Sequence, residues 1–485
     1  MNKRAVFLFF LLILLFSCKE SSHFQFERTD FSDTSLFTRF ILPLHSRELL
    51  KNLPYNNLYR LYIDIDRQSK TVNAEAQIMY YNSSGIDLQA IQFRMLMNSK
   101  DHTPMIIHSV QIDEIPVGFS LSEDNTTLVI ALGKELLPGK IVNLTIHYSL
   151  DFTTRPSYYF DFARIDENGF SIPHFFPIAA RVVKGEWEND FLADGGDLLS
   201  ADSSWFMVEI VTDDKVVIVT SGKEVSSEIR RGRQKKAYVA GPVRDFFICG
   251  ATSYIPQVTL SGETKIISYS LNKDIASSRK AASITASALS LFSSKFGMYP
   301  YEDLKITALP MSALGIEFPS VFSIKEDLYK DPDGYLFEPT IVHETAHQWF
   351  YSLLGNNQLR DPWIDEGLAQ YSVWLYYRER YGASTALRLF NSFTDRWDRI
   401  ERQKLPINKN VGFYQGKEYG AIIYGRAPIF LLDVKNIMGE ELFHRFIRHL
   451  ITQYSHKQID TEIFRTELIH FAGASIDPLF GEYFD

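Results

Sequence analysis

Two short segments near residue 350 constrain the fold of this chain more than any other feature. The first contains His343, Glu344 and His347, and the second contains Glu366, separated from His347 by 18 residues. Residues four apart lie on one face of an α-helix, so both histidines can offer a ring nitrogen to one metal ion. Glu344 stands beside the first histidine, where it can reach a metal-bound water instead of the metal. The pattern predicts a helix that carries part of a metal site.

Glu366 completes a set of three protein ligands, which is typical of a catalytic zinc ion that keeps one position open for water. The sequence therefore predicts one Zn²⁺ per chain, held by His343, His347 and Glu366. Such an ion lowers the pKa of its bound water to about 7, and Glu344 would act as general base on that water. The alternative is a helix with two structural histidines, which the added glutamate disfavours.

Local signals place a helix at each segment. Pro339 suits a first helical turn and Gly355 suits a helix end, which predicts a first helix between them. Asp361, followed by a proline, is a typical start for a second helix, which we expect to continue to about Gly382. Glu366 would then lie in the first turns of the second helix and face the first.

The rest of the chain divides into two regions of different pattern. Residues 46–255 hold many short alternating apolar runs separated by turn signals, which predicts a β-sandwich-like domain. Residues 256–485 are mainly helical, with strand-like runs at 304–309 and 321–324. We therefore expect a multidomain α+β chain, in which a sheet domain precedes a mainly helical catalytic domain with a small sheet.

The N-terminus has the pattern of a secretory signal. A short basic start precedes twelve unbroken apolar residues, 5–16, too few to span a bilayer. The four residues that end at Cys18 resemble the lipobox of bacterial lipoproteins, whose cysteine carries lipid. We expect a signal peptide over 1–17, a polar tether over 18–45 and a location in the bacterial cell envelope, in the periplasm or at the cell surface. A cleaved signal with an incidental cysteine is the alternative.

Charge and cysteine content disfavour a nucleic-acid-binding protein and an intrachain disulfide. The net charge of −9, without a long basic run, disfavours nucleic acid as a partner. Cys18 and Cys249 are the two cysteines of the sequence, so a lipid on Cys18 would leave no intrachain disulfide. A chain of 485 residues is large enough to need none.

The histidines outside the zinc segment carry weaker signals. His174, between Pro173 and an aromatic pair, is expected to be structural. The three near the C-terminus, His444, His449 and His456, are expected on exposed helical faces.

Four motifs together resemble the aminopeptidase N family of gluzincin zinc metallopeptidases. The zinc segment, HExxH followed by 18 residues and a glutamate, is one of them. Residues 296–301 resemble the entry to the family's catalytic domain, 314–319 its exopeptidase motif, and 419–427 its active-site tyrosine segment. The motifs stand in the family's order. The resemblance implies a thermolysin-like catalytic domain and release of N-terminal residues from peptides.

The resemblance also implies roles for individual residues. Tyr424 would donate a hydrogen bond to the oxyanion of the transition state, with Tyr419 the poorer candidate by alignment. Glu317, in the exopeptidase motif with Gly315, would bind the α-ammonium group of the substrate. The alternatives are a core aromatic for Tyr424 and an edge-strand charge for Glu317. Phe318 departs from the family pattern, which has asparagine there.

The second departure is length. The printed chain ends soon after the tyrosine segment, so we expect a form that lacks the family's C-terminal helical domain and has an open cleft.

We therefore expect a zinc aminopeptidase that acts on peptides with a free N-terminus and is anchored to a membrane through Cys18. An endopeptidase on the same scaffold is the first alternative, and it would cut blocked peptides. A non-enzymatic envelope scaffold is the second, and it would bind no stoichiometric zinc. Retention of the three ligands and Glu344 disfavours the scaffold.

Overall fold

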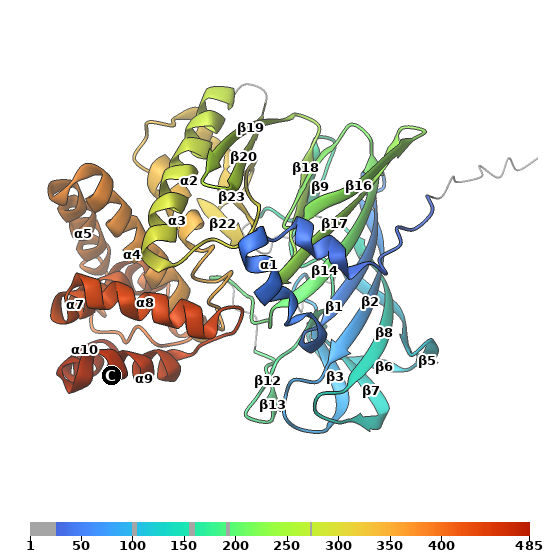
Figure 1. Ribbon diagram of the computed structural model, residues 1–485, viewed down its shortest axis with the longest axis horizontal. Coiled ribbons are helices and arrows are strands. Elements are labelled where there is room, and N and C mark those ends of the chain that lie inside the picture. Colours follow the sequence, from blue (N-terminus) through green and yellow to red (C-terminus); the bar gives the residue numbers. More distant parts are fainter. Residues whose placement is uncertain (1–25, 99–103, 155–160, 191–194, 272–273) are drawn as a thin grey trace, which may run out of the picture.

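The computed structural model describes residues 26–98, 104–154, 161–190, 195–271 and 274–485. Strands fill the N-terminal half and helices most of the C-terminal half, and the two halves lie side by side (Figure 1). This confirms the predicted α+β chain. The signal peptide and Cys18 lie outside the described residues. Among the described residues, no helix has both the length and the apolar character needed to cross a membrane.

The largest element of the N-terminal half is a twisted eight-stranded sheet. In β1 buried side chains alternate with partly buried ones, and Leu61, Ile63 and Ile65 face the core. All neighbouring pairs are antiparallel except β1 and β14. In spatial order the strands are β16 (Lys223–Arg230), β17 (Arg233–Val243), β14 (Ser204–Asp213), β1 (Leu58–Asp66), β2 (Thr71–Tyr81), β8 (Ile141–Asp151), β4 (Met105–Ile112) and β5 (Ile115–Val117).

Smaller sheets complete this half. One contains β15 (Val217–Thr220), β18 (Ile248–Ala251), β10 (Gly169–Ile172) and β9 (Arg164–Ile165). Another contains β11 (Ile178–Ala179), β3 (Leu88–Arg94), β7 (Thr127–Leu136) and β6 (Phe119–Leu121). A two-stranded ribbon consists of β12 (Val182–Val183) and β13 (Glu186–Trp187).

The first described residues pack on the large sheet, which corrects the described part, residues 26–45, of the tether expected for 18–45. Arg28 donates two hydrogen bonds to Glu75, at 2.6 and 2.7 Å. Phe37 is fully buried and its ring centroid lies 4.6 Å from that of Trp205. Apolar side chains within this polar stretch thus hold it down from residue 26 onward. It forms η1 (Thr34–Arg39), α1 (Pro43–Leu50) and η2 (Leu53–Tyr55).

The C-terminal half begins with a five-stranded sheet. Its spatial order is β19 (Tyr254–Ser261), β20 (Thr264–Leu271), β21 (Asp303–Leu309), β23 (Val321–Lys325) and β22 (Gly315–Phe318). The division expected between residues 255 and 256 falls inside β19. Strand β22 lies at the edge and runs antiparallel to β23. A sheet edge near the predicted zinc segment can pair with an extended peptide.

Helices form the rest of this half. They are α2 (Ile275–Phe296), η4 (Glu326–Lys330), α3 (Phe337–Ala346), α4 (Pro362–Tyr381), α5 (Ala383–Trp397), η5 (Val411–Phe413), α6 (Glu418–Ala421), the π-helical η6 (Ile422–Arg426), α7 (Ala427–Met438), α8 (Glu440–Tyr454), α9 (Thr461–Ala472), η7 (Gly473–Ile476) and α10 (Asp477–Tyr483). Helix α4 confirms the second helix expected from the sequence, up to Gly382. Helix α3 ends at Ala346, well before Gly355, which corrects the first.

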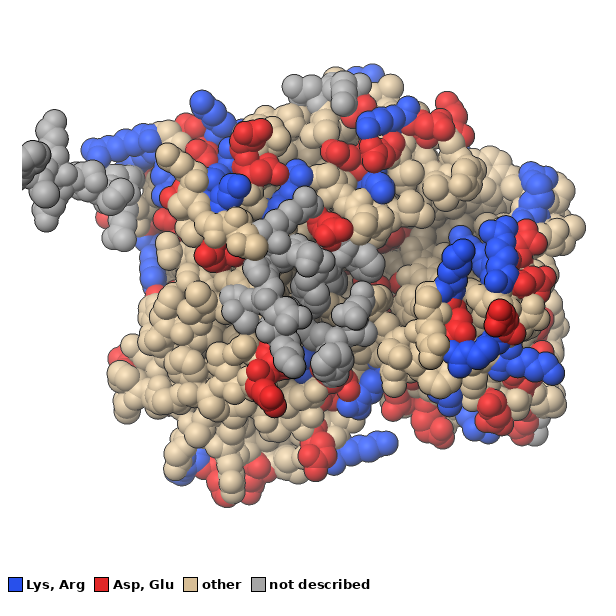
Figure 2. Space-filling model, turned by 180° about the vertical axis from the view of Figure 1, so that it is seen from behind, with Lys and Arg blue, Asp and Glu red and all other residues tan. Residues whose placement is uncertain are grey.

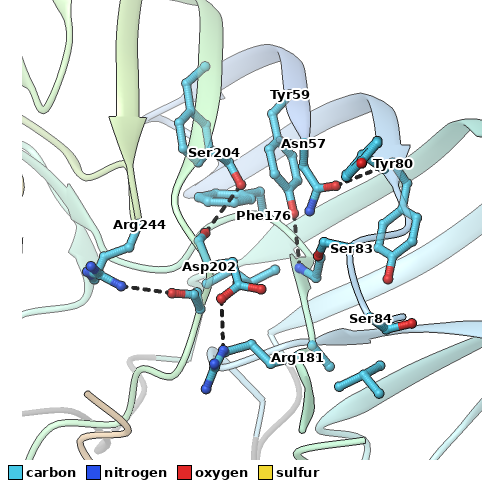
Figure 3. A pocket seen from close by; sticks show the side chains of 17 residues that line it. Asn57, Tyr59, Tyr80, Ser83, Ser84, Phe176, Arg181, Asp202, Ser204 and Arg244 are labelled. Atoms are coloured by element: carbon cyan, nitrogen blue, oxygen red, sulfur yellow. Dashed lines mark hydrogen bonds and ion pairs between the residues drawn. The ribbon is translucent and has the colours of Figure 1, made fainter. Parts of the chain in front are cut away.

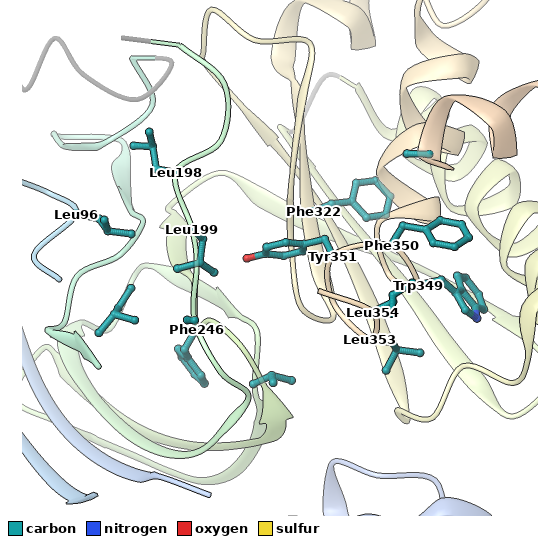
Figure 4. Close-up of a cluster of buried hydrophobic side chains, with 14 of the residues drawn as sticks. Leu96, Leu198, Leu199, Phe246, Phe322, Trp349, Phe350, Tyr351, Leu353 and Leu354 are labelled. Atoms are coloured by element: carbon teal, nitrogen blue, oxygen red, sulfur yellow. The ribbon is translucent and has the colours of Figure 1, made fainter. Parts of the chain in front are cut away.

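One hydrophobic core joins the two halves (Figure 4). Leu198, Leu199 and Phe246 contribute from the sheet half, and Tyr351 and Leu353 from the turn region after α3. The early end of α3 follows from this packing, because the residues after it turn back into the shared core. Continuous burial of this kind fixes the loop before β14 against the helical half.

A polar cavity of about 200 Å³ is lined by residues of the sheet half (Figure 3). Its charged groups have partners within the protein. Arg181 Nε donates to Asp202 at 2.9 Å, and Arg244 Nη1 donates to the carbonyl of Ala201 at 3.0 Å. Arg244 also donates through Nη2 to the carbonyl of Leu353 at 3.3 Å, and this bond links the two halves.

Candidate active site

Helices α3 and α4 bring the three predicted zinc ligands together. The Nε2 atoms of His343 and His347 lie 3.0 Å apart. Oε2 of Glu366 lies 3.0 Å from the first of these atoms and 3.6 Å from the second. The i, i+4 spacing on α3 aligns the two rings, and the first turns of α4 supply the carboxylate. Three donor atoms therefore converge on one point.

The donor set fits a zinc ion. Oε2 of Glu366 is buried and has no hydrogen-bond partner among the described residues, so the fold leaves this oxygen for another ligand. Nδ1 of His347 lies 2.9 Å from the carbonyl of Phe350, which fixes the ring with Nε2 toward the centre. Nearby carboxylates, Glu317 first, outweigh burial and raise the pKa of His347. Two imidazoles and a carboxylate in a negative environment suit a divalent zinc ion.

Glu344 lies beside this centre on α3. It is buried, and Oε2 has no hydrogen-bond partner in the described part of the chain. Burial, reinforced by neighbouring acids, raises its pKa well above the ordinary value. Gly315 lets the carboxylate occupy this place, because a Cβ there would lie 2.3 Å from Oε1 of Glu344. Both predicted residues, Glu344 and Gly315, thus belong to one contact.

Glu317 projects from edge strand β22 to the same centre and is buried. Nε2 of Gln358 donates hydrogen bonds to Oε1 of Glu317 at 2.8 Å and to Oδ2 of Asp365 at 3.0 Å. Burial raises the pKa of Glu317 and brings that of Asp365 to about 7. Gln358 therefore holds two carboxyl groups next to the ligand set.

Asp197 is a site residue that sequence reasoning missed. It lies in the loop before β14, belongs to the sheet half and lines the same cavity as Glu317 and Glu366. Burial, followed by the charge of Glu317, raises its pKa well above the ordinary value. The preceding Gly196, with φ of +74°, is the weak signal that the sequence offers, since it allows a tight turn there.

Tyr424 lies on the π-helical turn η6 and lines the cavity. Its hydroxyl donates a hydrogen bond to Oε1 of Glu366, whereas Oε2 of the same carboxylate lies near the two histidines. Tyr419 is partly buried nearby, with ring centroids 5.9 Å apart, but its hydroxyl has no partner in the described residues. A π-helical turn often marks a functional site, and here it carries the tyrosine.

Phe318 packs away from the cavity. Its ring stacks on Phe247 at 4.2 Å between centroids, and Phe162 lies in the same cluster. The sequence suggested an apolar pocket from Phe318, Phe322, Trp349 and Phe350 or, alternatively, core packing, and all four are buried in the core.

Some of the other histidines differ in burial from what the sequence predicted. His174 is buried beside Asp245, at 3.2 Å, in a structural position. His444 is buried and His456 is partly buried, which corrects their expected exposure, because α8 and the turn after it pack on the helical core. His449 is partly exposed and bonds to Glu467 at 2.9 Å.

These groups line a cavity of about 600 Å³. Acidic side chains gather at its buried part, and Arg396 and Arg399 line another wall. Seen from behind, the molecular surface is hollowed next to the helical half, with basic side chains on the helical side of that hollow (Figure 2). A cavity of this size is typical of small-ligand sites.

The chain is similar to known proteins both in sequence and in fold. Residues 280–483 match the peptidase family M1 domain. Leucine aminopeptidase 2 of Aspergillus oryzae is 27% identical over 191 residues, covering 36% of this chain and 29% of that protein. Endoplasmic reticulum aminopeptidase 2 of Bos taurus is 26% identical over 228 residues, covering 44% and 23%. The chain thus matches less than a third of the length of these curated relatives.

The likeness in fold extends over both halves. An M1 zinc metallopeptidase from Deinococcus radiodurans superposes with a TM-score of 0.66 at 15% identity, covering 89% of this chain and 94% of that one. A variant of that enzyme bound to a Tyr-Ser-Ala substrate has the same TM-score at 16% identity, covering 88% and 94%.

Proposed function

We propose that this chain, whose residues 280–483 match the peptidase family M1 domain, is a zinc aminopeptidase that releases N-terminal residues from peptides. The observation that carries the proposal is the acidic group beside the ligand set. Glu317 and Asp197 are buried there, and a carboxylate in such a place binds an ammonium group by charge-assisted hydrogen bonds. The relatives named as aminopeptidases support the same reading.

His343, His347 and Glu366 would hold the zinc ion, which supplies Lewis acidity to the reaction when bound. Glu344 takes a proton from the attacking water and transfers it to the departing amine. Water oxygen bonds to the carbonyl carbon, and the carbon–nitrogen bond of the peptide then breaks. Tyr424 donates a hydrogen bond to the oxygen that becomes negative, in place of its bond to Glu366.

Substrate orientation follows from two further features. The unpaired side of edge strand β22 can bind the peptide backbone by strand addition. Glu317 and Asp197 bind the free α-ammonium group, which places the first peptide bond next to Glu344. The Deinococcus enzyme bound to Tyr-Ser-Ala supports a tripeptide as a substrate for this fold.

The test compares one peptide with a free and with an acetylated N-terminus, with and without a zinc chelator. An aminopeptidase cuts the free form alone and loses activity with chelator. Cleavage of both forms would support the endopeptidase, and Glu317→Ala would then leave the rate unchanged. Zinc stoichiometry near zero in zinc-replete buffer would support the non-enzymatic scaffold.

We also propose that the protein is a lipoprotein outside the cytoplasmic membrane, attached through Cys18. The apolar run over 5–16 and the lipobox-like end support this location. Fractionation of cells that express the wild type and Cys18→Ser tests it. Loss of membrane association in the variant supports the anchor, and equal soluble recovery of both would refute it.

A further inference from the structure

Two arginines of the cavity form no ion pair within the described part of the chain. Arg396, on the last turn of α5, and Arg399, just beyond it, line the cavity and are exposed within it. Neither has a hydrogen bond or an ion pair with any described residue. Neighbouring arginines are paired: Arg378 with Glu440 and Arg402 with Glu418. The acid on the same wall, Asp395, forms no ion pair with Arg396 or Arg399 in the described structure. These two positive charges are thus available to a ligand.

The fold fixes Arg396 next to the reaction centre. Helix α5 packs directly on η6, because Gly425 has no side chain to separate them. A Cβ on Gly425 would lie 2.9 Å from the carbonyl oxygen of Phe393 and 3.5 Å from Cβ of Arg396. Gly425 follows Tyr424, so the close contact holds Arg396 beside the tyrosine. Arg396, Tyr424 and His343 line the same cavity.

The cavity therefore has opposite charges on two walls. Glu317 and Asp197 enter the cavity from β22 and from the loop before β14, whereas Arg396 and Arg399 enter it from the end of α5. A short peptide is a zwitterion with an ammonium group at one end and a carboxylate at the other. Charge complementarity of this kind sets register and specificity more than raw affinity.

We propose that Arg396, with Arg399 behind it, binds the C-terminal carboxylate of di- and tripeptides, so that the site selects short peptides with both ends free. The inference rests on the proposed aminopeptidase function and names its substrate class. A cavity of about 600 Å³ has room for a peptide of this length. Guanidinium binds carboxylate through two parallel hydrogen bonds, which also orients the chain. Longer peptides keep the ammonium contact and lose this second one.

The experiment measures kcat/KM of the full-length zinc-loaded chain for Ala-Ala-Ala and for its C-terminal amide. The ratio of the two values is the readout, because the N-terminus and side chains are identical. We expect the wild type to prefer the free acid by about tenfold. Arg396→Ala should bring the ratio close to one, and Arg396→Lys should retain part of it. Arg388→Ala, an exposed arginine on α5 outside the cavity, is the matched control and should keep the wild-type ratio.

Two outcomes overturn the proposal. One is a wild-type ratio near one, and the other is a wild-type ratio that persists in the Arg396→Ala, Arg399→Ala double variant. A higher kcat/KM for Ala-Glu-Ala amide than for Ala-Ala-Ala would indicate that the arginines bind an acidic side chain. This result would also overturn the proposal. Failure of the aminopeptidase function is separate, because neither the acid nor the amide would then be cut.

Discussion

The acidic and basic walls of the cavity are built in opposite ways. The acidic wall draws on β22, α4 and a loop of the sheet half, and Gln358 holds two of its carboxyl groups in place. The basic wall comes from the end of one helix, and its arginines are exposed and unpaired in the described structure. Buried groups with fixed partners are preorganised, whereas exposed long side chains adapt. We therefore expect the first wall to determine catalysis and the second to adjust substrate choice.

The largest effect on activity is expected from the substitution Glu344→Gln. We expect kcat to fall by a factor of about 10² to 10⁴, because the amide cannot accept the proton from water. Steady-state hydrolysis of a free tripeptide measures it, and zinc content should stay at the wild-type level. A fall of less than tenfold would remove Glu344 from the role of base.

Tyr424→Phe should lower kcat by about 10² to 10³, since one donor to the developing oxyanion is lost. Tyr419→Phe is the matched control, because that hydroxyl has no partner in the described residues. The same peptide assay compares the two. A larger fall of kcat in Tyr419→Phe than in Tyr424→Phe would assign the hydrogen bond to the oxyanion to Tyr419.

Glu317→Gln tests the acidic wall alone. We expect kcat/KM for a free peptide to fall by a factor of about 10 to 100, the value of one hydrogen bond to a charged group. Asp197→Asn should show a smaller effect of the same kind. An unchanged kcat/KM for the free peptide would exclude this role for Glu317.

The smallest expected effect is that of salt, which distinguishes the two walls by how exposed their charges are. Raising ionic strength from about 0.01 to 1 M shortens the Debye length from about 30 to 3 Å, which screens exposed charges far more than buried ones. The preference for a free C-terminus should therefore shrink with salt, while the preference for a free N-terminus persists. Parallel decline of both preferences would contradict the difference in burial.

Sequence reasoning reached the ligand set because its signal is local. The spacing of His343 and His347 on a helix, with Glu366 on the next, suffices to bring three donors together. Asp197 could not be found in this way, since it reaches the cavity through the packing of the two halves. Arg396 was equally hidden, because its place depends on the contact between α5 and Gly425.

The errors have the same physical origin. Helix α3 ends at Ala346, before the glycine that suits a helix end, because the following residues are buried in the shared core. Residues from 26 onward pack on the sheet, because aromatic side chains such as Phe37 outweigh a polar composition. His444 is buried beside Tyr371, at 2.9 Å, although helical periodicity alone placed it outside. Tertiary contacts decide such positions, and a single sequence does not reveal them.

Leu198 and Leu199 lie in the core that joins the two halves, immediately after Asp197. The carboxylate is thereby anchored by the same packing that unites the molecule. If whole domains were exchanged between related peptidases, Asp197 would move with the sheet half, whichever helical half that sheet was joined to. Chimeras should therefore inherit part of their amine recognition from the half that contributes no metal ligand.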